Sequence, residues 1–321
     1  MRVLLVGVGA VGIVLHRTIE QQKGNEVTFL VRAGKKRALE RTKIVDARSG
    51  ELRVRERPTA VEIGQVRPVY DTVLLCVRGE QLEAAIADLG PVAVNVRLAT
   101  VTPGPEGLAL LRARYPGHAA VRIAPVFMAY PDGDVIALWQ PPVLKTSVCH
   151  DDGDEASQKL ADELAAALVV GGIPARARAK MPMGTDTATD AMAPLLAAYA
   201  LSGYDADALA RDRGLQTLAA DAIAEVMALD GAPGIASALV RRATAPLVRI
   251  ALSDAAQRMP GTFRAMWRAH GPKIDGQTHA SISALVRRAQ AEQREVPALE
   301  EMRHRLDARP PATVANVKES A

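Results

Sequence analysis

Apolar runs and helical stretches alternate through the first half of the chain. Short apolar runs bounded by turn residues are typical of strands buried on both faces, whereas apolar residues three or four apart predict helices. The first strand is expected over residues 3–6. The pattern also predicts helices at residues 35–41, 81–89 and 154–168, strands at residues 27–31, 71–77, 94–101, 120–127, 135–138, 143–148 and 173–178, and a hairpin over residues 43–55.

The character of the chain changes after Lys180. Ala-rich helical periodicity continues to about Leu306, with breaks near residues 230–234 and 259–261. Residues 308–321 contain Pro310-Pro311 and are expected to form a disordered tail. Since 321 residues exceed the usual size of one domain, we expect an α/β domain at residues 1–178 and an all-α domain at residues 179–307.

A glycine-rich turn joins the first predicted strand to a helical pattern. It reads Gly-Val-Gly-Ala-Val-Gly, the dinucleotide fingerprint in the strand–turn–helix context that this motif requires. The first glycine allows a tight turn, the second lets the backbone approach a pyrophosphate, and the third lets the helix lie close to the strand. The alternative is a glycine turn that binds nothing. The predicted cofactor-binding residues here are Gly7, Val8, Gly9, Ala10, Val11 and Gly12, in a Rossmann domain.

The end of the second predicted strand indicates which cofactor is bound. An NAD site places an acidic residue about 20 residues after the glycines, to accept a hydrogen bond from the ribose 2′-hydroxyl. Here the strand ends in Arg32, followed by Lys35, Lys36 and Arg37. A guanidinium group suits a 2′-phosphate, so we predict NADP with Arg32 as the main contact. The alternative is a solvated basic turn.

Composition narrows the class of ligand and partner. Forty basic residues against 36 acidic ones are a mild excess that fits anionic small ligands, and an aromatic content of 3% argues against a stacking surface for nucleic acid. Cys76 and Cys149 lack metal-ligand spacing, so neither zinc nor a disulfide framework is expected. With no signal peptide and no membrane span expected, the predicted location is the cytoplasm.

The order of motifs resembles the ketopantoate reductase family, the NADPH-dependent 2-dehydropantoate 2-reductases. The resemblance rests on the glycine turn, on Val31-Arg32, on the segment Ile44–Gly50, on the stretch DTVLLCVRGEQ from Asp71 to Gln81, and on Glu225 within a helical stretch. It implies a Rossmann domain, a helical C-terminal domain for substrate binding and dimerisation, and a small 2-oxo acid as substrate. It also implies cofactor contacts from Cys76, Val77, Arg78 and Thr102.

Several positions depart from the family pattern. Arg78 replaces a lysine, and the Leu-Gln-Asn-Gly turn becomes Val101-Thr102-Pro103-Gly104. The two asparagines that follow the family's catalytic lysine are replaced by Gly184 and Ala188, and the late Thr-Glu-Ile-Asp motif reads Pro272-Lys273-Ile274-Asp275. We therefore expect a substrate other than ketopantoate.

Reducing a ketone requires a proton donor and a group that stabilises the developing alkoxide. Lys180 is the first candidate and Lys273 the second, although either could be a surface lysine. Asp186 and Asp190 share one helix face, with helix capping by Asp186 as the alternative role. The predicted catalytic residues are Lys180 and Lys273, and the predicted substrate-binding residues are Asp186, Asp190, His270 and Gln277.

Two classes of function remain open. The first is an NADPH-dependent reductase of a small ketone, 2-oxo acid or imine, with a homodimer as its candidate assembly. The second is a repurposed nucleotide-binding protein without catalysis. The loss of both family asparagines and of the late carboxylate keeps the second class in consideration.

Overall fold

The protein is described here by a computed structural model. The structure describes residues 1–32, 43–46, 52–54, 58–66, 69–90, 95–102, 106–132, 135–140, 145–151, 153–179, 185–229, 268 and 271–309. The chain divides into two compact units, Met1–Pro182 and Met183–Ala321. The first is an α/β unit and the second is helical in its described part. The fold class predicted from the sequence is therefore confirmed.

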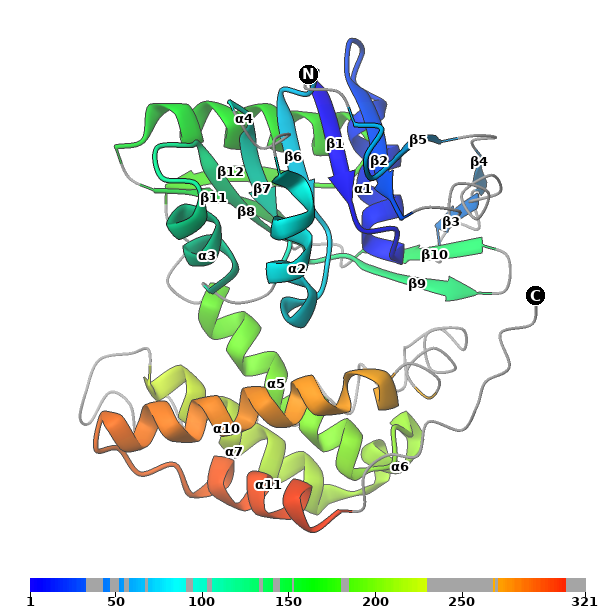
Figure 1. Ribbon diagram of the computed structural model, residues 1–321. Coiled ribbons are helices and arrows are strands. Elements are labelled where there is room, and N and C mark those ends of the chain that lie inside the picture. The colour runs from blue at the N-terminus through cyan, green and yellow to red at the C-terminus, as the bar shows by residue number, and fades with distance from the viewer. Residues whose placement is uncertain are drawn as a thin grey trace. The chain divides into compact units, whose positions relative to one another are not determined.

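The first unit is built on an eight-stranded sheet of order β12-β11-β8-β7-β6-β1-β2-β5 (Figure 1). All neighbouring strands are parallel except β8 and β11, which run antiparallel. The strands are β1 (Arg2–Val6), β2 (Glu26–Val31), β5 (Thr59–Glu62), β6 (Thr72–Leu75), β7 (Arg97–Thr100), β8 (Ala120–Ala124), β11 (Thr146–His150) and β12 (Ala175–Ala179). β12 forms one edge of the sheet and reads Ala-Arg-Ala-Arg-Ala.

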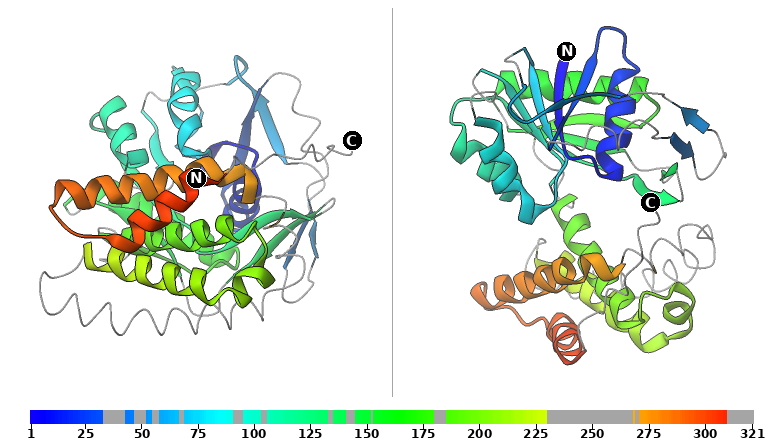
Figure 2. Two further views of the ribbon diagram at one scale, coloured as in Figure 1. Left: turned by 90° about the horizontal axis from the view of Figure 1, so that it is seen from below. Right: turned by 45° about the vertical axis from the view of Figure 1, so that its right-hand side comes forward.

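Helices cover both faces of this sheet (Figure 2). α1 (Ala10–Glu20) and α4 (Glu155–Val170) lie on one face, and α2 (Gly79–Leu89) and α3 (Glu106–Arg114) lie on the other. Successive side chains of β1 alternate between the two cores: Val3 and Leu5 pack with α1 and α4, while Leu4 and Val6 pack with α2 and α3. This double burial explains why residues 3–6 of β1 form an unbroken apolar run.

A second, four-stranded sheet has the order β4-β3-β10-β9. It consists of β3 (Lys43–Asp46), β4 (Leu52–Val54), β9 (Met128–Asp132) and β10 (Val135–Trp139). β3 and β4 pair antiparallel, so the hairpin predicted over residues 43–55 is confirmed. The connection between these two strands lies outside the described residues.

Three elements of the first unit were not predicted, namely α3, β5 and β9. The helix expected at residues 35–41 lies outside the described residues. The predicted strands at residues 71–77 and 94–101 are shorter in the structure, because only Thr72–Leu75 and Arg97–Thr100 join the ladder. Cys76, Val77 and Val101 belong to the turns that follow β6 and β7, and Val94 lies outside the described residues.

The second unit contains five described α-helices and one short 3-10 helix. These are α5 (Thr185–Leu201), α6 (Ala206–Arg211), α7 (Arg213–Leu229), η3 (Gly271–Ile274), α10 (Asp275–Ala291) and α11 (Pro297–Ala308). Its core is rich in alanine: Ala197, Ala198, Ala219 and Ala222 are all fully buried. Small side chains let α5 and α7 pack closely. The predicted breaks, and residues 310–321 of the expected tail, lie outside the described residues.

Buried polar contacts hold the helical unit together. The carboxylate of Glu225 on α7 is 3% exposed and accepts hydrogen bonds from the backbone N–H groups of Ala298 (3.0 Å) and Leu299 (2.9 Å) at the start of α11. The carboxylate of Asp275 at the start of α10 accepts from the Tyr204 hydroxyl and pairs with Arg309. Glu225 therefore acts as a helix cap supplied from another helix.

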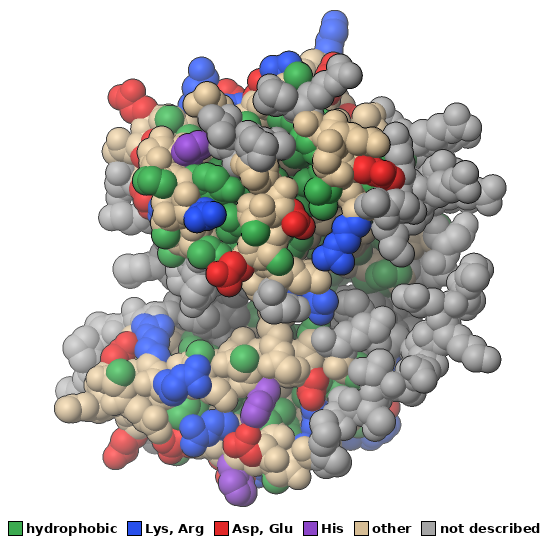
Figure 3. All heavy atoms as spheres, in the orientation of Figure 1, with side chains coloured by type: hydrophobic (Ala, Val, Ile, Leu, Met, Phe, Trp, Pro, Cys, Tyr) green, Lys and Arg blue, Asp and Glu red, His purple; other side chains and the backbone are tan. Residues whose placement is uncertain are grey.

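Among the helices that the structure describes, none is long and apolar enough to cross a membrane. On the face shown in Figure 3, the acidic and basic side chains of the described residues are interspersed and form no single basic area.

Candidate cofactor-binding site

The loop that follows β1 lies at the carboxyl end of an internal strand of the main sheet. β1 has β2 on one side and β6 on the other, and the chain passes through α1 to reach β2 (Figure 1). In open parallel sheets, ligands bind at the carboxyl ends of the strands where the strand order reverses. The glycine turn of residues 7–12 is at such a point.

Gly7 and Gly12 are required for steric reasons. Gly7 has φ +110°, and a Cβ atom there would lie 2.3 Å from the carbonyl oxygen of Cys76. A Cβ atom on Gly12 would lie 2.2 Å from the carbonyl oxygen of Gly7. The backbone N–H of Cys76 donates to the carbonyl oxygen of Val6 at 2.7 Å. The turn therefore packs tightly against the end of β6, and α1 packs against the turn.

Gly9 differs from these two glycines because it faces open space. It is the N-cap residue of α1, with φ −73° and ψ 170°, and a Cβ atom there would meet nothing within 4 Å. The first N–H groups of a helix lack acceptors within the helix and carry a partial positive charge. The first turn of α1 contains no acidic residue. This helix terminus is therefore open to an anion and is electrostatically suited to a phosphate.

A cavity of about 410 Å³ adjoins the turn. Its walls come from the carboxyl ends of β1 and β2, from the turn after β6 and from one face of α2. Arg32, directly after β2, is the basic side chain among its described lining residues. The cavity is lined by Val6, Gly7, Val8, Leu30, Val31, Arg32, Ile63, Val77, Gln81, Ala84, Ala85 and Asp88. Apolar walls with a guanidinium group at β2 suit a nucleoside that carries a phosphate.

The other predicted cofactor residues of this unit lie at the ends of β6 and β7. The backbone carbonyl of Cys76 contacts Gly7, and burial raises the pKa of the Cys76 thiol, which keeps the sulfur protonated. Val77 lines the cavity. Arg78 is the N-cap residue of α2, and its backbone N–H donates to the carboxamide oxygen of Gln81 at 3.3 Å.

Thr102 is buried and its hydroxyl is engaged within the protein. The hydroxyl donates to the carbonyl oxygen of Val77 at 3.3 Å and accepts from the hydroxyl of Thr100 at 2.9 Å. The backbone N–H of Thr102 donates to the same Thr100 hydroxyl oxygen at 3.1 Å. Thr102 thus ties the turn after β7 to the turn after β6, next to the glycine loop.

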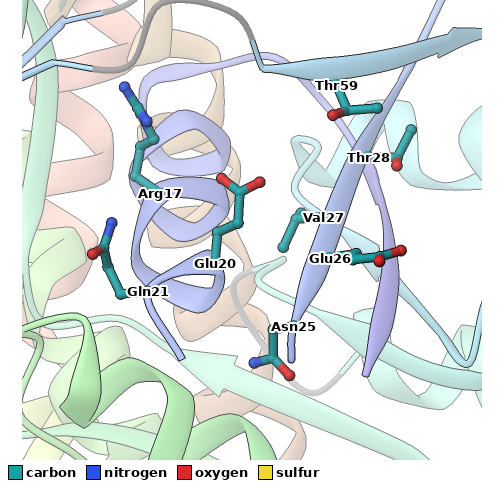
Figure 4. Close-up of a pocket in the computed structure, with 8 residues that line it drawn as sticks. All are labelled: Arg17, Glu20, Gln21, Asn25, Glu26, Val27, Thr28 and Thr59. Atoms are coloured by element: carbon teal, nitrogen blue, oxygen red, sulfur yellow. The ribbon is translucent and has the colours of Figure 1, made fainter. Parts of the chain in front are cut away.

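A second cavity, of about 550 Å³, lies at the opposite end of the strands. It is formed by the start of β2, the start of β5 and the last turns of α1. Figure 4 shows Arg17 and Glu20 projecting from α1, with Gln21 directly after the helix and Glu26 on β2. The negative end of the α1 dipole and two carboxylates make this cavity unfavourable for a phosphate. It is not a second candidate for the cofactor.

The predicted catalytic and substrate-binding residues are not brought together by the described part of the structure. Lys180 and His270 lie outside the described residues. The backbones of Lys273, in η3, and of Asp186 and Asp190, in α5, are described, but their side chains are not. Gln277 is exposed in the first turn of α10. All six remain predictions.

Eight residues that line the cavity were not predicted as site residues, namely Val6, Leu30, Val31, Ile63, Gln81, Ala84, Ala85 and Asp88. Ala84 and Asp88 lie on one face of α2 with Gln81, at the spacing of successive helical turns. The helical period of residues 81–89 could have shown this face. Whether this face of α2 borders the cavity depends on how α2 packs against the sheet.

Comparisons with known proteins agree with this architecture. Residues 3–130 match the family model described as "Ketopantoate reductase PanE/ApbA". No curated protein matches the chain. Similar solved structures include a 2-dehydropantoate 2-reductase from Geobacter metallireducens, which is 14% identical with a TM-score of 0.73 over 96% of this chain and 99% of that chain.

Two further structures have the same fold. A D-mandelate dehydrogenase solved with NADH and anilino(oxo)acetate is 14% identical, with a TM-score of 0.67 over 96% of this chain and 97% of that chain. A dimeric ketopantoate reductase from Staphylococcus aureus is 13% identical, with a TM-score of 0.64 over 96% and 98%. The resemblance predicted from the sequence is therefore confirmed: residues 3–130 carry the sequence pattern of the ketopantoate reductase PanE/ApbA family, and the chain has the fold of these reductases.

Proposed function

We propose that the protein is an NADPH-dependent reductase of a small ketone or 2-oxo acid. The observation that carries this proposal is the position of Arg32 in the cavity that adjoins the glycine turn. The turn provides an open helix terminus for a pyrophosphate, and the cavity provides apolar walls for the adenosine. Arg32 stands where β2 ends, which is where a dinucleotide fold meets the adenosine ribose.

NADPH fits this cavity better than NADH. Arg32 can hold a 2′-phosphate through two parallel hydrogen bonds, and the residues that follow it in the sequence are Ala33, Gly34 and Lys35, none of them acidic. A charge-assisted hydrogen bond contributes about 1.5–3 kcal/mol, which corresponds to about a tenfold or larger difference in affinity.

Bound NADPH would supply a hydride to the carbonyl carbon of the substrate. The chain must then supply a proton to the carbonyl oxygen and stabilise the charge that develops there. We assign these roles to Lys180 and Lys273. Asp186, Asp190, His270 and Gln277 are assigned to substrate binding. A second copy of the chain as a dimer partner is part of the same proposal, as is action in the cytoplasm.

Ketopantoate is not the proposed substrate. The positions of the two family asparagines are occupied by Gly184 and Ala188, and Lys273 replaces the late carboxylate. A site that forms hydrogen bonds to a substrate hydroxyl discriminates strongly by means of those bonds. Without the two carboxamides, that discrimination is expected to be absent, while Lys273 would favour an anionic substrate.

Cofactor titration is the first test. NADPH should bind the protein about tenfold or more tightly than NADH, and Arg32→Ala should remove most of that difference. Arg114→Ala is the matched control, because Arg114 is exposed on α3 and does not line the cavity. Equal affinity of the unaltered protein for the two cofactors would contradict the assignment of Arg32.

Cofactor oxidation is the second test. NADPH consumption would be measured with a panel of 2-oxo acids that includes ketopantoate. We expect turnover of a member other than ketopantoate. Tight NADPH binding without oxidation by any small ketone, 2-oxo acid or imine would instead favour a non-catalytic nucleotide-binding protein.

A further inference from the structure

One face of α2 forms a wall of the 410 Å³ cavity and has a distinct chemical pattern. It presents two small apolar side chains, Ala84 and Ala85, between Gln81 in the first turn and Asp88 in the last. Asp88 lies seven positions after Gln81 in the helix, which corresponds to a rise of about 10 Å along the helix axis. A flat apolar surface bounded by two polar groups suits a planar heterocycle with polar edges.

The two ends of this face are not equivalent. Gln81 lies next to the glycine turn, because the turn packs on Cys76 and α2 begins at Gly79. Asp88 therefore lies at the end of the face remote from the predicted pyrophosphate site. A dinucleotide whose pyrophosphate is at the turn would direct the outer edge of its base toward Asp88.

The carboxylate of Asp88 lies in an unfavourable position within the protein itself. It is in the last turn of α2, where the helix dipole disfavours an anion, and that turn has no basic residue. Within the part of the chain that the structure describes, it makes no ion pair or hydrogen bond. An ionised carboxylate is only an acceptor, so the ligand group that suits it is an N–H donor.

We propose that Asp88 makes the cavity selective for adenine, by accepting a hydrogen bond from the exocyclic amino group of the base. The adenine ring lies against Ala84 and Ala85, and its 6-amino edge faces the carboxylate. Hypoxanthine has a carbonyl oxygen at the same position, and this oxygen would be repelled by the carboxylate. This inference rests on the proposed function, since it takes the cavity to hold the adenosine half of NADPH.

Equilibrium binding of two dinucleotides tests the proposal without any turnover. NADPH and its hypoxanthine analogue would be titrated against the protein and followed by fluorescence of the reduced nicotinamide. The unaltered protein should bind NADPH about tenfold more tightly than the analogue, as expected for a hydrogen bond to a charged group. Asp88→Asn should bring the two dissociation constants to within about threefold, because a carboxamide can accept from an amino group or donate to a carbonyl.

The matched control is Glu83→Gln. Glu83 is also exposed on α2 but does not line the cavity, so this change removes the same charge from the same helix. It should leave the preference for NADPH over the analogue unchanged.

Three results would overturn the proposal. The first is equal affinity of the unaltered protein for NADPH and the analogue. The second is a loss of discrimination in Glu83→Gln as large as in Asp88→Asn. The third is an Asp88→Asn variant that alters the NADPH-to-NADH ratio but retains the preference for adenine, which would mean that Asp88 acts through Arg32. Failure of both dinucleotides to bind would instead refute the proposed function.

Discussion

Replacing Gly9 by alanine should separate cofactor binding from folding. The backbone of Gly9 is extended, with φ −73° and ψ 170°, a conformation that any L-residue adopts. A Cβ atom there would meet no atom within 4 Å. Alanine restricts the unfolded chain more than glycine does, which favours folding by about 0.4–1 kcal/mol, but it is a poorer N-cap residue than glycine. Because the two effects oppose each other, we expect the free energy of unfolding to change by less than about 1 kcal/mol.

The free energy of NADPH binding should change by more than this. The new methyl group would stand on the open side of the α1 N-terminus, where the pyrophosphate is predicted to approach. The phosphate would then move away from the N–H groups of the first helical turn. Loss of one charge-assisted hydrogen bond costs about 1.5–3 kcal/mol, so the dissociation constant should rise by about tenfold or more.

The assay combines urea unfolding with NADPH titration on the same preparations. Gly276→Ala in α10 is the matched control, because its Cβ atom would also meet nothing within 4 Å; it should leave NADPH affinity unchanged. Gly7→Ala is the opposite case: φ +110° and a 2.3 Å approach to the Cys76 oxygen should destabilise the fold by more than about 2 kcal/mol. A stable Gly9→Ala protein that binds NADPH as tightly as the unaltered protein would refute the reasoning.

Three further predictions concern stability, pH and catalysis. Glu225→Ala should lower the free energy of unfolding in urea by about 2–3 kcal/mol, since the buried N–H of Leu299 and the partly buried N–H of Ala298 lose their acceptor; a change within about 0.5 kcal/mol of zero would contradict this role. The Ser157 hydroxyl and backbone N–H donate to Asp154 at the N-cap of α4 and lower the pKa of its carboxyl below the ordinary value of 3.8. This contribution to the free energy of unfolding is present above pH 3.8 and is lost as the pH falls through the folded-state pKa. Asp154→Asn should therefore keep the helix cap near pH 7 but reduce the loss of stability on acidification, measured as the free energy of unfolding against pH. An unchanged loss of stability at acidic pH would contradict this role of Asp154. Lys180→Ala should lower kcat far more than it changes the NADPH dissociation constant, and an active protein indifferent to this change would exclude Lys180 as the catalyst.

Much of the first unit could be predicted because its signals are local. β1 is apolar from Val3 to Val6 because these side chains enter two cores, and the glycine turn follows it directly. α3 was missed because it has no clear apolar stripe. Leu111 is fully buried, whereas Leu108 and Leu110 are only partly buried. β5 is a four-residue edge strand whose pairing with β2 depends on tertiary structure.

The candidate site was only partly predictable for a related reason. The turn and Arg32 follow from sequence spacing, since strand ends and glycines are visible in the sequence. Asp88 lines the cavity because one particular face of α2 borders it, and Ile63 does so because one side of the turn after β5 borders it. Tertiary packing decides both. Local reasoning could not show that the Thr102 hydroxyl is held by Val77 and Thr100.

The arginines of β12 limit how two copies of the chain can associate. The strand lies at an edge of the main sheet and carries Arg176 and Arg178 two residues apart, so both side chains leave the same face. If two copies joined their β12 edges antiparallel about Ala177, each Arg176 would stand opposite the Arg178 of the other copy, and like charges in that position are destabilising. In this register a continuous sheet across two subunits through the β12 edge is thus disfavoured, and the proposed homodimer should not use this pairing.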